Sequence, residues 1–105
     1  MNELDKFIFL HKYKLGILKQ GEVRMEIFDI LVTLSKINSE KVICALRDFL
    51  VNGVSRKEAC LNNNLSLGYF SISLKKLNDT NNCIAGIIHY HKNLIQNEYQ
   101  NNSEK

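Results

Sequence analysis

The chain has 105 residues, a formal net charge of +3, no proline and three cysteines. This length fits one domain, and no segment approaches the ~18 consecutive apolar residues that predict a membrane span. The apolar run at residues 7–10 is interrupted at once by His11 and Lys12, so it is too short for a secretory signal and we expect a cytoplasmic protein. The cysteines are odd in number and widely spaced, which argues against a disulfide framework and fits a reducing compartment.

Residues 1–21 mix apolar and basic positions without a clear period, and we expect them to be flexible and irregular or weakly helical. The first helix is predicted at about residues 22–36. Its apolar stripe at helical spacing comprises Val23, Ile27, Ile30, Leu31 and Leu34. Three more apolar residues, Met25, Phe28 and Val32, lie off that stripe. A helix that is apolar on most of its circumference needs cover on more than one side, and a second copy of the chain is a plausible cover.

The second helix is predicted at about residues 40–52. Ser39 is a suitable N-cap, and Gly53 stands where a left-handed residue would end the helix. A third helix begins at the capping box formed by Ser55 and Glu58 and runs to about residue 62.

Two asparagines at positions 63 and 64 then predict a turn, because asparagine tolerates the left-handed conformation. A fourth helix follows at about residues 67–77, capped by Ser66. We expect a polar break at residues 78–82, a last helix at about 83–96 and a flexible tail at 96–105.

These elements predict an all-α fold. The helices at 40–52, 55–62 and 67–77 form a trihelical core, the first helix packs on it, and N- and C-terminal segments flank it. Residues 1–105 make a single domain with its core at about 22–78.

Residues 55–77 fit a helix-turn-helix. That motif needs a small residue where its two helices cross, a residue at ease with positive φ four places later, and apolar residues that lock the second helix to the core. Those positions hold Cys60, Asn64, Leu65 and Phe70. The core face of the second helix is predicted to carry Leu67, Phe70, Leu74 and Leu77. The plainer alternative is an ordinary helical hairpin inside a bundle.

The charge of the chain is concentrated in this segment. Residues 55–77 carry four basic side chains and one acidic side chain, Glu58. The net charge of this segment, +3, therefore equals the net charge of the whole chain. A local basic patch on a near-neutral protein is typical of a polyanion-binding site. The predicted DNA-binding residues are Arg56, Lys57, Gly68, Tyr69, Ser71, Ile72, Lys75 and Lys76. Arg56 and Lys57 are assigned to phosphates, because the first helix of the motif crosses the DNA backbone.

Three stretches of this region resemble the PapB-type regulators of adhesin biosynthesis. They are Leu50-Val51-x-Gly53, Ser55-Arg56-Lys57-Glu58-x-Cys60 and Gly68-Tyr69-Phe70-Ser71. Phe28, Leu31 and Ser35 also fit, so the resemblance covers roughly residues 21–77. It implies a bacterial cytoplasmic regulator of fimbrial operons, associated with the nucleoid when bound, that binds A·T-rich double-stranded DNA as a homo-oligomer.

The side chains on the exposed face of the fourth predicted helix fit weak recognition of DNA bases. The exposed side of residues 67–77 has no Arg, Asn or Gln for bidentate base contacts. It offers Ile72 for thymine methyls, Gly68 for close approach, and hydroxyls at Ser71 and Ser73. Such a surface favours T-containing steps and DNA shape. Specificity would then come from several copies on spaced repeats.

Other interpretations remain open at this point. One is a helical protein–protein adaptor with an incidental basic patch, and another is a single-stranded nucleic-acid binder, which Tyr69 alone would serve as a stacking ring. Cys60 lies one turn after Arg56 and invites a redox-sensor role through a lowered pKa, against a buried core position.

We expect neither an enzyme nor a metal site. His89 and His91 diverge by about 200° on a helix, so they do not chelate a metal together with Cys83. No Gly-rich phosphate loop, carboxylate pair or Ser/His/Asp arrangement is evident, so no cofactor and no small-molecule substrate are expected.

Overall fold

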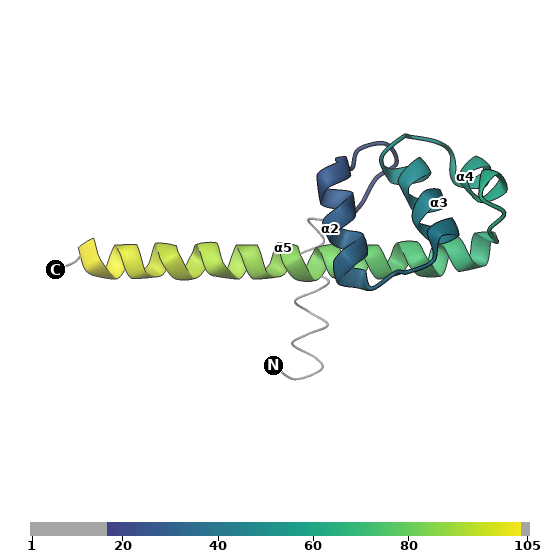
Figure 1. The fold of residues 1–105 in the computed structure, drawn as a ribbon. Coiled ribbons are helices and arrows are strands. Elements are labelled where there is room, and N and C mark those ends of the chain that lie inside the picture. The colour runs from purple at the N-terminus through teal and green to yellow at the C-terminus, as the bar shows by residue number, and fades with distance from the viewer. Residues whose placement is uncertain (1–16, 104–105) are drawn as a thin grey trace. The chain divides into compact units, whose positions relative to one another are not determined.

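The computed structural model describes residues 17–103, with side chains up to Ile95. It has four helices, and no strand occurs in that part of the chain (Figure 1). These helices are α2 (Met25–Ser35), α3 (Glu40–Leu50), α4 (Arg56–Asn62) and α5 (Leu67–Ser103). Residues 17–81 form one compact unit, and α5 from Asn82 onward belongs to a second one. The all-α prediction is therefore confirmed, and none of the described helices is long and apolar enough to cross a membrane.

The core of the compact unit is built from all four helices. Fully buried aromatic rings come from α2 (Phe28) and α5 (Phe70), and α3 contributes fully buried aliphatic side chains. The apolar core residues are Val23, Phe28, Leu31, Val42, Ala45, Leu46, Phe49, Leu50, Ala59, Cys60, Phe70, Leu74 and Leu77. Burial of such side chains is the main favourable term in folding.

The predicted helix starts of α4 and α5 are confirmed by their caps. The Ser55 hydroxyl accepts a hydrogen bond from the Glu58 amide at 3.1 Å, and the Ser66 hydroxyl accepts one from the Tyr69 amide at 3.1 Å. Each bond satisfies an amide that has no partner within the first turn of its helix. Ser39 also occupies an N-cap position, before α3, but its side chain makes no capping bond.

The segment ahead of α2 makes a turn at Gln20 and Gly21 and is bonded to the end of α3. The Gly21 amide donates to the Phe49 carbonyl and the Val23 amide to the Leu50 carbonyl, both at 3.0 Å. Gly21 and Gly53 both have positive φ, and a Cβ built on Gly21 would lie 3.1 Å from the Gly53 Cα. This close approach requires glycine at position 21. Residues 1–16, for which an irregular or weakly helical segment was predicted, lie outside the described residues.

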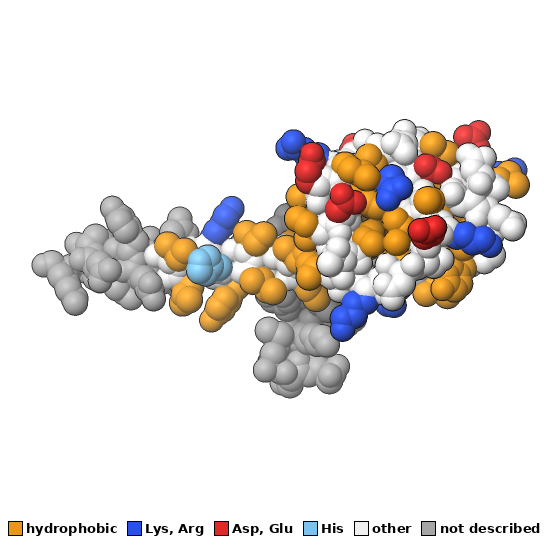
Figure 2. Space-filling model, in the orientation of Figure 1, with side chains coloured by type: hydrophobic (Ala, Val, Ile, Leu, Met, Phe, Trp, Pro, Cys, Tyr) orange, Lys and Arg blue, Asp and Glu red, His pale blue; other side chains and the backbone are white. Residues whose placement is uncertain are grey.

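The predicted apolar stripe of the first helix was right only in part, because Val23 and Leu31 are buried but its other three members are not. Ile27, Ile30 and Leu34 are 46, 53 and 54% exposed, whereas Phe28, Leu31 and Ser35 are buried. α2 is apolar on two faces, and the face with the Phe28 ring faces the core. A hydrogen bond from the Ser35 hydroxyl to the Thr80 hydroxyl, 2.9 Å long, fixes the same orientation. Figure 2 shows hydrophobic side chains gathered over α2 on the face that it draws.

The predicted break at residues 78–82 was also wrong, because α5 runs through it without interruption. Three of the polar side chains there are bonded to the helix itself or to a neighbouring segment. Asn78 Oδ1 accepts from the Leu18 amide at 2.9 Å, and the Thr80 hydroxyl donates to the Lys76 carbonyl at 3.0 Å. Asp79 pairs with Lys75 one turn earlier, at 3.1 Å. With neither glycine nor proline in this stretch, these bonds keep it helical. The last predicted helix is thus the continuation of α5.

The orientation of α2 is tested by two single substitutions. Phe28→Ala is expected to lower the free energy of unfolding by about 3–5 kcal/mol, because it leaves a cavity in the core. Ile27→Ala, its matched control on the exposed face, is expected to change that free energy by less than about 1 kcal/mol. Urea denaturation at low protein concentration measures both, and equal losses would mean that Ile27 faces the core.

Candidate nucleic-acid interface

The corner between α4 and α5 is a tight turn fixed by backbone bonds. Asn64 has a φ of 51°, as its predicted left-handed role requires. The Leu65 amide donates to the Cys60 carbonyl at 2.9 Å. Asn63 Nδ2 donates to the Ala59 carbonyl at 2.8 Å and to Asp48 Oδ2 at 3.0 Å, which ties the turn to α3. Local hydrogen bonds therefore set the angle at which α5 leaves α4.

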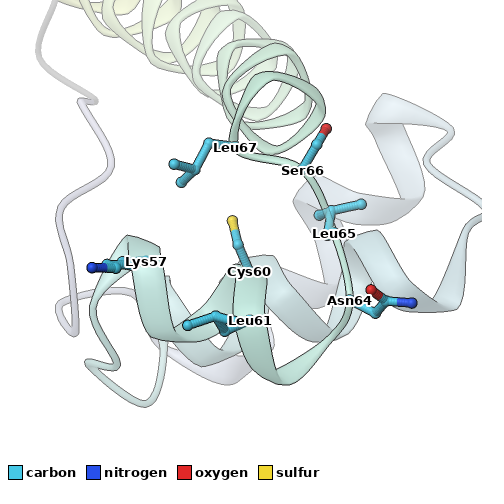
Figure 3. A pocket seen from close by; sticks show the side chains of 7 residues that line it. All are labelled: Lys57, Cys60, Leu61, Asn64, Leu65, Ser66 and Leu67. Carbon is cyan, nitrogen blue, oxygen red and sulfur yellow. The ribbon is translucent and has the colours of Figure 1, made fainter.

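Cys60 occupies the buried position predicted for the crossing of the two helices. Its side chain is almost fully buried and borders an open hollow of about 440 Å³ between α4 and α5 (Figure 3). Burial raises the pKa of the Cys60 thiol, and the nearby charge of Arg56 opposes this rise only in part. A redox sensor needs a lowered thiol pKa, so the direction of the shift contradicts that interpretation and supports a core role.

Three helices meet at an aromatic pair next to this corner. Phe49 of α3 and Phe70 of α5 pack edge to face, with ring centroids 5.6 Å apart. The guanidinium carbon of Arg56, the first residue of α4, lies 5.5 Å from the Phe49 centroid and 5.6 Å from the Phe70 centroid. Such contacts attract a cation to the face of each ring. The exposed Arg56 is therefore held in place by the core that it borders.

All eight predicted DNA-binding residues are exposed. They are Arg56, Lys57, Gly68, Tyr69, Ser71, Ile72, Lys75 and Lys76. A Cβ added to Gly68 would meet nothing within 4 Å, so the backbone there is open to a close-lying molecule. Lys75 forms an exposed pair with Asp79. Lys57 borders the hollow of Figure 3, and Tyr69, Ile72 and Lys76 border a second one.

Two assignments on α5 were wrong. Leu67, predicted to face the core, is 52% exposed. It is the first residue of α5 and projects into the hollow beside Cys60 (Figure 3). Ser73, predicted to offer a hydroxyl on the outer face, is only 7% exposed. With Phe70, Leu74 and Leu77 inward, the turn of 100° per residue carries Ser73 toward the core.

The second hollow adds residues that the sequence alone did not suggest. It measures about 180 Å³ and lies between α5 and the loop that joins α2 to α3. From that loop come Lys36, Asn38 and Ser39. Lys36 ends α2 in a left-handed conformation, with a φ of 57°. No local sequence signal places this loop beside α5, because the contact spans more than 30 positions.

The described residues contain no group of three side chains suited to hold a metal. Nε2 of His89 lies 3.2 Å from Nδ2 of Asn93 on the next turn of α5. His91 is exposed.

Comparison with known proteins identifies related chains. A family model described as PapB, adhesin biosynthesis transcription regulatory protein, matches residues 1–91. The regulatory protein FanB of Escherichia coli is 42% identical over 89 residues, which cover 85% of this chain and 87% of FanB. The pilus-subunit operon regulatory protein PapB of E. coli is 36% identical over 83 residues, or 79% of this chain and 80% of PapB. The crystal structure of E. coli FocB matches with a TM-score of 0.68 and 36% identity, covering 81% of this chain and 97% of FocB.

The packing at Cys60 is tested by changing its size. Cys60→Leu is expected to lower the free energy of unfolding by about 1–3 kcal/mol, because the crossing of α4 and α5 has little spare space. Cys60→Ser keeps the size and is expected to be tolerated better. Thermal unfolding of the two variants measures the difference, and equal stability would show that the position is not confined.

Proposed function

The chain belongs to the PapB family of adhesin biosynthesis transcription regulatory proteins, and we propose that it controls a fimbrial or adhesin operon by binding A·T-rich double-stranded DNA as a homo-oligomer. Members of this family are transcription regulators and not enzymes. In the proposal, α4 and the first turns of α5 form a helix-turn-helix, with the exposed side of α5 toward the DNA.

The observation that carries this proposal is the corner of α4 and α5. Its first helix is buried at Cys60, its turn passes through left-handed Asn64, and its second helix is locked by buried Phe70. These are the requirements of a helix-turn-helix. The exposed side of α5 then carries Lys75 and Lys76, which suit the phosphates that flank a groove.

Arg56 and Lys57 are proposed to bind phosphates of the DNA backbone. They occupy the first turn of α4, where a helix presents free amides and favours anions. The contacts of Arg56 with Phe49 and Phe70 restrict its guanidinium before DNA arrives. A restricted side chain loses less conformational entropy on binding.

Base recognition is proposed to be weak and to depend on DNA shape. Burial of Ser73 removes one of the two serine hydroxyls first assigned to the outer face of α5. Tyr69, Ser71 and Ile72 remain there, and none of them makes the bidentate contacts that identify guanine or adenine. Ile72 is 68% exposed and suits the methyl groups of thymine. An A·T-rich site with a favourable groove shape fits this surface best.

Oligomerisation is proposed through exposed apolar surface. On α2, the stripe of Ile27, Ile30 and Leu34 is one such surface. Met25 and, within the later part of α5, Ile87 and Ile88 are also exposed, whereas Phe28 belongs to the core and is withdrawn from this set. Contiguous exposed apolar side chains are typical of protein–protein contacts. Copies joined in this way would gain avidity on neighbouring DNA sites.

The salt dependence of binding tests the DNA interface. Each phosphate neutralised contributes about −0.9 to the slope of log affinity against log salt. Lys75→Ala with Lys76→Ala is expected to flatten that slope by up to about 1.8 on an A·T-rich duplex. Lys19→Ala, an exposed lysine outside the helix-turn-helix, serves as the control. An unchanged slope would remove both lysines from the interface.

The same mobility-shift assay separates the proposal from its alternatives. A helical protein–protein adaptor would bind no duplex, and a single-strand binder would prefer the unpaired strand. Mixed-sequence duplex serves as the control for A·T preference. Equal binding to A·T-rich and mixed duplexes would contradict that preference.

The oligomer is tested by varying the number of sites. Affinity is expected to rise steeply as A·T-rich repeats are added at a fixed helical phase, because neighbouring copies raise one another's effective concentration. Ile30→Lys on the α2 stripe is expected to abolish the gain from a second repeat while leaving single-repeat binding intact. Tight binding to one repeat with no gain from a second would contradict the proposal.

A further inference from the structure

The hollow between α5 and the α2–α3 loop has the composition of an anion site. Two lysines that are far apart in the sequence border the hollow. Lys36 comes from the loop and Lys76 from α5. Within the described residues, neither ammonium group has a salt bridge or a hydrogen-bond partner, and no acidic residue borders the hollow. Its volume of about 180 Å³ has room for several waters. Two free cations therefore border a space open to a hydrated anion.

Helix α3 begins at the same hollow. Ser39, its N-cap residue, borders the hollow but makes no side-chain capping bond. The first amides of a helix have no partner within the helix, and they carry its positive dipole end. An anion at this place would accept from those amides, as phosphates do at other helix N-termini.

The Ser73 hydroxyl, which has no hydrogen-bond partner in the described part of the chain, is the second and independent sign of a ligand. Ser73 is 7% exposed, yet within the described residues its hydroxyl makes no hydrogen bond. It borders the hollow beside Lys76 and Tyr69. The hydroxyl oxygen is not among the fully buried atoms without a partner, so a molecule in the hollow can reach it. A ligand oxygen in the hollow would accept from this hydroxyl.

Lys36 occupies a backbone position that favours glycine. Its φ of 57° belongs to the left-handed cap of α2, a position that glycine fills without strain. A lysine there costs stability, and its side chain borders the hollow. The opposing charge nearby is Glu40, the exposed first residue of α3, which does not itself border the hollow.

We propose that this hollow binds one phosphate of the DNA backbone, held by Lys36 and Lys76, by the Ser73 hydroxyl and by the first amides of α3. The inference rests on the proposed DNA-binding function, because Tyr69, Ile72 and Lys76 belong to both surfaces. It extends the interface from α4 and α5 to the α2–α3 loop, and it gives a fixed point beside the exposed face of α5.

Lys36→Gly provides a test that a folding defect does not confound. Glycine relieves the left-handed strain, so the variant is expected to unfold at the same or a higher temperature than the parent chain. It also removes one phosphate contact, so its salt slope on an A·T-rich duplex is expected to be flatter by about 0.9. Lys36→Gln removes the charge without relieving the backbone and is expected to give the same change in slope. Lys19→Gln, outside the hollow, is the matched control and is expected to keep the parent slope.

Ser73→Ala tests the hydroxyl separately from charge. Its affinity for the duplex is expected to fall roughly tenfold at every salt concentration, as for a lost hydrogen bond, with the slope unchanged. Glu40→Gln is expected to have the opposite effect and tighten binding at low salt, because it removes an anion near the site.

The outcomes separate this inference from the function on which it rests. If the parent chain binds no duplex, the proposed function fails. If the parent chain binds and the two Lys36 variants keep its salt slope, the phosphate site is overturned while DNA binding stands. Parent-like affinity of Ser73→Ala would likewise overturn the proposed site, since the Ser73 hydroxyl would then have no part in it.

Discussion

The contact between Phe49 and Phe70 is the interaction on which the arrangement of the helices depends. It joins α3 to the first turns of α5, and Arg56 at the start of α4 lies against both rings. An edge-to-face pair of this kind contributes about 0.5–1.5 kcal/mol beyond the burial of its area. Its larger effect is geometric. With Phe70 directed inward, the rotation of α5 about its axis is set, and with it the choice of side chains that face outward.

Polar contacts between distant segments then hold the compact unit around this pair. Asp48 of α3 accepts from Asn63 in the turn after α4, and Ser35 of α2 bonds Thr80 of α5. Such bonds add modest stability, on the order of 1 kcal/mol each. The larger effect of these hydrogen bonds is on alignment, because each bond fixes which turn of one helix lies beside the neighbouring segment. The polar stretch of α5 around residue 80 is thus an anchoring surface and not a linker.

Features that depend on neighbouring residues could be predicted from the sequence, and features that depend on packing between distant segments could not. The caps at Ser55 and Ser66 and the left-handed turn at Asn64 could be predicted, because the residues that form them are within three or four positions of one another. The buried face of α2 could not, because α2 is apolar on two faces and its choice depends on Thr80, 45 positions away. The hollow at Lys36 escaped prediction for the same reason. Its walls come together only after α2, α3 and α5 have packed.

The exposed stripe of α2 is apolar, whereas the exposed face of α5 carries Lys75 and Lys76. None of Ile27, Ile30 and Leu34 borders the hollow at Lys36, and none lies on α5. Phe28 and Ser35 occupy the core side of α2, and the stripe stays exposed in the described part of the chain. A partner copy seated there would leave the residues proposed to bind DNA uncovered. In the proposed oligomer, weak base readout by each copy would be sufficient, since the spacing of several copies would supply the discrimination that one α5 lacks.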